Sequence, residues 1–244
     1  MASSTSCYNF PPKSKIIHYI TDSLLWNSLT LESYSRILEH LFYHVDFSFP
    51  EELDEWKRIF QNPADSPVSY TRFLQCRTEL FDVEDARWIK GFNCVEHLEV
   101  FGDRRGTPNS GSFRAFHNLS PCVKSLLVQW RDLPLQEVFE LICSFPELEN
   151  LNVWSYKGHA DKPIDESISQ DLVLPVFTGT LVLGKVTAGF VRKLLGFGEP
   201  HNFRKIVVGY CFAYQFEGVN NLVKKCSHTL ESIIVDYDEN QPGE

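Results

Sequence analysis

The chain has 244 residues, of which 43% are hydrophobic and 23% are charged, and its formal net charge is −9. This composition is typical of a globular protein rather than a disordered one, and the length allows one or two domains with a sizeable core. The negative charge argues against broad binding to nucleic acid phosphates and against binding to an anionic membrane surface, because both need a basic surface.

The seven cysteines are dispersed, odd in number and free of any C-x-x-C pair, which indicates reduced thiols. The first residues, Met1 to Thr5, are followed by no apolar segment typical of a signal peptide. No apolar run approaches the about 20 residues that span a bilayer. We therefore expect a cytoplasmic or nuclear protein with neither a membrane nor a nucleic acid partner.

Residues 1–67 predict an irregular, mainly helical N-terminal cap. One apolar stripe runs through residues 30–44 at helical spacing, and the sequence Pro50-Glu51-Glu52 suits the first turn of a helix over 50–60. His40 and His44 lie one helical turn apart in the first of these helices. No third metal ligand accompanies them, so we expect structural histidines and no metal site.

Residues 68–237 predict a repeating unit of one strand and one helix. Residues 68–76 suit the strand of an incomplete first unit. Six further segments share an apolar anchor, and successive anchors are roughly 25–30 residues apart, close to the about 20–29 of leucine-rich repeats. These segments are 95–100, 123–128, 148–153, 180–183, 203–208 and 230–235, with the anchors Leu98, Leu126, Leu151, Leu181, Ile206 and Ile233.

Helical patterns separate most of these strands, namely 83–91, 134–145, 187–197 and 216–226. Residues 155–171 predict a long polar loop, and residues 238–244 form an acidic tail. One unit cannot bury its own apolar face, whereas stacked units can. The pattern therefore predicts an α/β, leucine-rich-repeat-like solenoid with a parallel sheet on one face and helices on the other. An ordinary α/β sheet of βαβ units is the alternative.

The segment from Tyr70 to Tyr237 resembles the leucine-rich-repeat part of F-box-type proteins that are abundant in mushroom-forming fungi. The matching segments are 83–92, 95–98, 119–126, 142–151, 177–181 and 226–231. The resemblance implies a non-enzymatic recognition scaffold, with a Skp-type adaptor as a candidate partner. It covers about two-thirds of the chain, but no L-P-x-E-[IL] signature of an F-box precedes Tyr70.

The outward positions of the strands are the candidate binding residues, because alternate strand residues point to opposite faces. Leu127, Val182, Val207 and Ile234 would form an apolar band on the concave face of such a solenoid, beside the aromatic anchor Trp154. The full candidate set is Glu99, Phe101, Leu127, Gln129, Asn152, Trp154, Val182, Val207 and Ile234. The competing interpretations are that a loop or the N-terminal region covers this band, or that both faces are buried as in a parallel sheet.

Three functional hypotheses follow. The first is a non-enzymatic scaffold that binds a protein partner, and the second is an F-box-type substrate receptor of a ubiquitin ligase. The third is an enzyme with dispersed catalytic residues on an α/β sheet. The sequence contains no phosphate-binding loop and no G-x-S-x-G motif, so no catalytic residue and no cofactor is assigned.

Overall fold

The computed structural model describes residues 31–62, 66–80, 86–102, 115–117, 119–130, 135–155, 172–185, 188–198, 201–209 and 216–236. The chain divides into two compact units, Met1–Leu41 and Phe42–Glu244. Helix α2 (Leu31–Phe42) confirms the helix predicted over 30–44 but ends two residues earlier. The predictions for residues 1–30, the loop 156–171 and the tail 238–244 lie outside the described residues.

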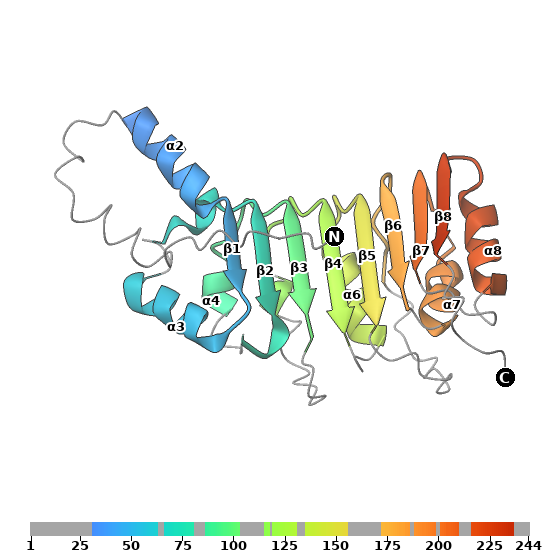
Figure 1. Cartoon of the computed structure of the whole chain (residues 1–244), viewed down its shortest axis with the longest axis horizontal. Coiled ribbons are helices and arrows are strands. Elements are labelled where there is room, and N and C mark those ends of the chain that lie inside the picture. Colours follow the sequence, from blue (N-terminus) through green and yellow to red (C-terminus); the bar gives the residue numbers. More distant parts are fainter. Residues whose placement is uncertain are drawn as a thin grey trace, which may run out of the picture. The chain divides into compact units, whose positions relative to one another are not determined.

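The second unit is built on one eight-stranded sheet in which every neighbouring pair is parallel and the strands follow their order in the chain. Figure 1 shows the strands side by side in this sequence. Their bounds are β1 His44–Phe47, β2 Phe73–Arg77, β3 His97–Phe101, β4 Ser125–Trp130, β5 Asn150–Ser155, β6 Thr180–Gly184, β7 Lys205–Gly209 and β8 Ser232–Asp236.

The six anchors stand opposite one another across this sheet. Leu98 pairs with Leu126, Leu126 with Leu151, and the column continues through Leu181 and Ile206 to Ile233. From Leu98 to Ile206 each anchor is at most 1% exposed. The register confirms that these residues form one continuous core column, as strand alternation predicted.

Helices cover the face of the sheet to which these anchors point. Figure 1 shows α4 and α6 behind the strands. In α6, Val138, Phe139, Leu141 and Ile142 are buried, and the ring of Phe139 stacks on Phe190 of α7 at 5.0 Å. The helix bounds are α3 Pro50–Ile59, α4 Ala86–Ile89, α6 Leu135–Cys143, α7 Ala188–Gly196 and α8 Phe216–Cys226, with the 3-10 helices η3 Pro67–Tyr70 and η4 Thr78–Leu80.

The C-terminus of α7 is held by side chains from later in the chain. The Lys225 ammonium of α8 donates to the carbonyl oxygens of Leu195 (3.0 Å) and Phe197. The buried His201 ring bonds through Nε2 to the Leu194 carbonyl oxygen at 2.9 Å. These donors satisfy carbonyls that the end of a helix leaves without a partner, and α7 ends one residue before the end of the helical pattern predicted over 187–197.

A repeated backbone contact fixes the register where the strands begin. The carbonyl oxygen of Glu96 accepts hydrogen bonds from the amides of Lys124 (2.9 Å) and Ser125 (3.0 Å) in the next unit. The carbonyl oxygens of Tyr43, Arg72, Lys124, Gly179 and Arg204 each accept two successive amides at the start of the next strand in the same way. That of Glu149 accepts only the Gly179 amide, because the Thr180 amide donates to the Asn150 side chain instead. This regularity means that successive strands are placed against one another by the same local geometry.

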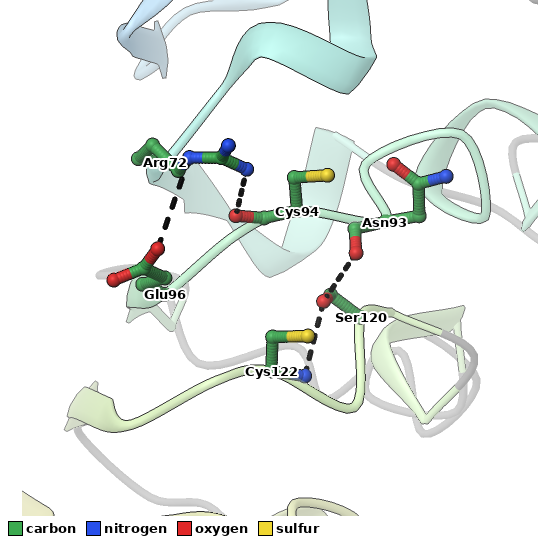
Figure 2. A network of polar contacts seen from close by, with 6 residues as sticks. All are labelled: Arg72, Asn93, Cys94, Glu96, Ser120 and Cys122. Atoms are coloured by element: carbon green, nitrogen blue, oxygen red, sulfur yellow. Dashed lines mark hydrogen bonds and ion pairs between the residues drawn. The ribbon is translucent and has the colours of Figure 1, made fainter.

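Side chains tie the turns between units together, as Figure 2 shows. The buried Ser120 hydroxyl donates to the carbonyl oxygen of Asn93 at 2.6 Å and accepts from the amide of Cys122 at 3.1 Å. The Arg72 guanidinium donates to the carbonyl oxygen of Cys94 at 3.0 Å. The bonds from Ser120 to Asn93 and from Arg72 to Cys94 join the turn before one strand to the neighbouring strand unit, while the Cys122 amide orders the turn that contains Ser120.

The sheet starts earlier than the sequence indicated. Strand β1 lies within residues 1–67, where an irregular, mainly helical cap was expected, and its Val45 and Phe47 are buried. The strand expected over 68–76 begins only at Phe73, after the 3-10 helix η3. Phe47 contacts Trp56 of α3 with ring centroids 5.6 Å apart, so this end of the core is covered by a helix.

Candidate functional site

The side chains that point away from the helices form a second surface of the sheet, which we call the open face. Strand pairing arranges them in three rows across the sheet. The start row is His44, Phe73, His97, Ser125, Asn150, Thr180, Lys205 and Ser232; the middle row is Asp46, Gln75, Glu99, Leu127, Asn152, Val182, Val207 and Ile234; the end row is Arg77, Phe101, Gln129, Trp154, Gly184, Gly209 and Asp236.

All nine candidate residues fall on this open face, in the middle and end rows. Eight of them are half-buried, and the ninth, Ile234 on the last strand, is 46% exposed. By contrast, the residues between them along the same strands are buried, such as Leu126 and Val128 beside Leu127. The alternation predicted from the sequence therefore brings the candidates together on one surface.

The end row contains an indole laid across its neighbours. A Cβ atom at Gly184 would lie 2.6 Å from Cζ3 of Trp154 and still closer to two other ring atoms, and a Cβ at Gly209 would lie 3.9 Å from Cη2. The ring of Trp154 therefore extends from β5 over β6 toward β7. Glycine on both strands leaves room for it, so the indole lies flat and is half-buried.

The middle row changes character along the sheet. Leu127, Val182 and Val207 give it apolar side chains over β4 to β7, while Asp46 and Glu99 make it acidic over β1 to β3. Burial raises the pKa of Glu99, and the neighbouring Asp46 carboxylate raises it further, whereas His97 opposes the shift. The open face thus places negative charge at one end of an apolar band.

Asn152 interrupts the apolar part of this row. Its Oδ1 atom is buried and has no hydrogen-bond partner among the described residues. An unsatisfied buried acceptor costs about 1–3 kcal/mol. The Oδ1 atom of Asn152 therefore adds no hydrogen bond to a described residue, unlike the amide of Gln75, which donates to the Ser48 hydroxyl at 3.0 Å.

The start row is used largely by the fold itself. The rings of His44 and Phe73 are 4.3 Å apart, and Phe73 stacks on His97 at 6.2 Å. Asn150, one of the outward residues, accepts a hydrogen bond from the Thr180 amide at 2.8 Å. At the other junctions the corresponding amide donates to a backbone carbonyl oxygen of the preceding unit, so here the Asn150 side chain takes the place of that carbonyl.

Neither a metal centre nor a membrane span is evident among the residues that the structure describes. They contain no group of three or more His, Cys, Asp or Glu side chains that could bind a metal ion. Their helices are too short or too polar to cross a bilayer. The five cysteines in these residues are free thiols, and burial followed by the nearby Glu140 charge raises the pKa of Cys143 to about 11.

The chain was compared with family models, curated proteins and solved structures. None of them matched.

Several residues of this surface were not singled out from the sequence. His44 and Asp46 were missed because β1 was not expected. Gln75 lies within the strand expected over 68–76 but was given no outward position, and Arg77 lies beyond the expected end of that strand. The two glycines over which the Trp154 ring lies could have been recognised in the sequence, because Gly184 and Gly209 end their strands at equivalent positions. A residue without a side chain at the same place on adjacent strands indicates close approach by another group.

Proposed function

We propose that this chain is a non-enzymatic interaction scaffold of the leucine-rich-repeat type and that its open face binds a protein partner. The observation that carries this proposal is the indole of Trp154 lying flat on Gly184 beside half-buried aliphatic side chains. Aromatic anchors in apolar surroundings dominate the binding energy of many protein interfaces. The solenoid interpretation is supported by the sequential, all-parallel strand order and by the repeated carbonyl contacts between units.

The chemistry of the face favours a particular kind of partner. Leu127, Val182 and Val207 suit an apolar segment of the partner, and the half-buried Gln129 lies beside them in the end row. Asp46 and Glu99 favour a basic side chain at the β1–β3 end of that segment. A partner with apolar residues followed by a lysine or arginine fits this arrangement.

Affinity capture with matched variants tests the proposal. The full chain and its Trp154→Ala variant would be used as baits in lysate of the source cells, with Glu147→Ala as the control. Glu147 is exposed in the turn before β5 and lies off the open face. We expect a protein captured by the wild type and by Glu147→Ala to be lost with Trp154→Ala. Equal recovery with all three baits would contradict the assignment of the open face.

The F-box-type receptor is the second proposal, and it rests on the resemblance of residues 70–237. It adds one requirement to the first, namely binding of a Skp-type adaptor by the N-terminal residues. A pull-down of a purified adaptor with the full chain separates the two proposals. Absence of adaptor binding would remove the receptor role and leave the scaffold role intact.

A further inference from the structure

Strand β8 differs from the rest of the sheet in that its core-facing side chains are not covered. Ile233 continues the anchor column but is 46% exposed, whereas Ile206 beside it is completely buried. Val235 is 43% exposed on the same face, and Ile234 is 46% exposed on the open face. Three adjacent apolar side chains are thus left half in solvent on the last strand, a known liability for edge strands.

The opposite edge of the sheet is different. Val45 and Phe47 of β1 are only 4% and 2% exposed, and α3 supplies Trp56 against Phe47. Because β1 offers no uncovered apolar column, a head-to-tail contact between β1 of one copy and β8 of another would bury little apolar surface. A partner for β8 has to present an uncovered strand of its own.

The backbone of β8 defines how such a partner can pair. The Ser232 amide donates to the Arg204 carbonyl oxygen at 3.1 Å, so Ser232 faces β7. In a parallel ladder successive residues direct their backbone groups alternately to the two sides. The amides and carbonyls of Ile233 and Val235 therefore point to the free edge. These two residues are placed symmetrically about Ile234.

We propose that two copies of the chain associate through β8, antiparallel, about a two-fold axis at Ile234. Ile233 of one copy then stands opposite Val235 of the other, and their free amides and carbonyls form hydrogen-bonded pairs on both sides of the axis. Side chains that stand opposite each other in an antiparallel pair of strands lie on the same face of the sheet. Ile233 and Val235 of both copies therefore form one apolar cluster on the core face. The two Ile234 side chains meet on the open face.

The charges at the ends of β8 agree with this pairing. Ser232 stands opposite Asp236 of the second copy, so the two Asp236 carboxylates are kept apart. Lys205 is the neighbour of Ser232 on β7, in the same row. It therefore lies two strand spacings, about 10 Å between Cα atoms, from Asp236 of the second copy, which a lysine and an aspartate side chain span together. Within one chain Lys205 and Asp236 lie at opposite ends of adjacent strands.

Helix α8 extends the apolar edge. Its Gly218 and Lys225 face α7, since a Cβ at Gly218 would lie 3.2 Å from Val191 and Lys225 bonds to the end of α7. Val223 then lies on the side of α8 that is turned away from α7, and it is half-buried. The contact between copies would cover Val223 together with Ile233 and Val235. The net charge of −9 opposes association, but at 0.15 M salt this repulsion is screened beyond about 8 Å.

Sedimentation of the full chain over a range of micromolar concentrations at 0.15 M salt tests the proposal. We expect a dimer of twice the 28.2 kDa chain mass at the higher concentrations. Ile234→Lys places like charges directly opposite each other and should raise the dimer dissociation constant about tenfold or more. Val207→Lys, one strand further in on the same row, is the control and should leave dimerisation unchanged.

Three further variants keep the test independent of folding defects. Val235→Pro removes a free-edge donor and no bond to β7, so it should abolish the dimer while circular dichroism stays that of the wild type. Asp236→Lys should weaken the dimer, and the double variant Lys205→Asp/Asp236→Lys should restore it. A monomer at all concentrations, or a dimer insensitive to Ile234→Lys and Val235→Pro, would overturn the proposal, as would capture of a different protein at this edge by a monomeric chain.

Discussion

The indole ring of Trp154 occupies the space in which a Cβ atom of Gly184, on the neighbouring strand, would lie. Replacement of Gly184 by alanine therefore has to displace the ring. The overlap involves three ring atoms and not the tip of a flexible chain, so we expect the indole to leave the sheet and become more exposed. The indole N–H resonance of Trp154, identified by its loss in Trp154→Phe, should shift toward that of a solvated indole.

Gly209→Ala is the matched control for this change. Its added Cβ would lie 3.9 Å from the same indole, which is an ordinary van der Waals distance. We expect the Trp154 resonance to stay near its wild-type position. An equal response to both substitutions would mean that the ring does not lie over Gly184.

Two adjacent leucines test which face of the sheet is the core. Leu126 is completely buried and Leu127 is half-buried on the open face. Leu126→Ala should reduce the free energy of unfolding by about 2–5 kcal/mol because it leaves a cavity. Leu127→Ala removes the same atoms from a partly solvated site and should cost less than about 1.5 kcal/mol. Urea denaturation measures both, and similar losses would contradict the assignment of faces.

The sequence predicted those parts of the fold that depend on local periodicity. Leu98, Leu126 and Leu151 were recognised as equivalent because each begins the same apolar alternation, and the structure places them in one register. Strand β1 was missed because its four residues follow the apolar stripe of a helix without a break. Phe42, the last residue of that helix, packs against Trp56 in the same cluster as Phe47.

The candidate site was predictable only as a set of outward positions. Alternation put Trp154 and Leu127 on the same face, which the structure confirms. The position of the Trp154 ring depends on two glycines that are 30 and 55 residues away along the chain. The bond from the Thr180 amide to Asn150 is equally distant in sequence, so local pattern gave no sign that this side chain is used by the fold.

Glu99 should make stability depend on pH. Because burial and Asp46 raise its pKa above 4.5 in the folded chain, the folded state binds the proton more tightly than the unfolded state. Its contribution to stability is therefore greatest below about pH 4.5 and is lost as the pH rises through the folded-state pKa. Glu99→Gln should raise the melting temperature at pH 7 relative to wild type, and the gain should shrink toward pH 4.

Exposed Glu149 provides the comparison for this experiment, since it precedes β5 outside the acidic end of the open face. Glu149→Gln should leave the pH dependence of the melting temperature as it is in the wild type. A Glu99→Gln variant with no gain at pH 7 would show that the carboxylate is not destabilised by its surroundings.

His201 should make the folded chain less stable as the pH is lowered, which is the reverse of the effect of Glu99. Burial lowers its pKa, the bond to Leu194 opposes this shift, and the Lys225 charge adds to the lowering. The unfolded chain therefore takes up a proton more readily, and stability is lost as the pH falls below the unfolded-state pKa near 6.5. Between pH 7.5 and 5.5 the melting temperature of the wild type should fall more steeply than that of His201→Gln.

The exposed His228, which is bonded to the Asn202 side chain at 2.8 Å, is the control for His201. His228→Gln should retain the wild-type dependence on pH. Identical slopes for wild type and His201→Gln would contradict a buried neutral imidazole at the end of α7.

The affinity of the captured partner for the chain shows whether the open face is its binding site. Isothermal titration would compare the dissociation constants of wild type, Trp154→Ala and Glu147→Ala, each shown to melt as a folded protein. An anchor residue at the centre of an interface contributes about 2 kcal/mol or more, so Trp154→Ala should raise the dissociation constant about thirtyfold or more. Glu147→Ala should leave it unchanged. An unaltered dissociation constant for Trp154→Ala would show that the partner binds elsewhere on the chain.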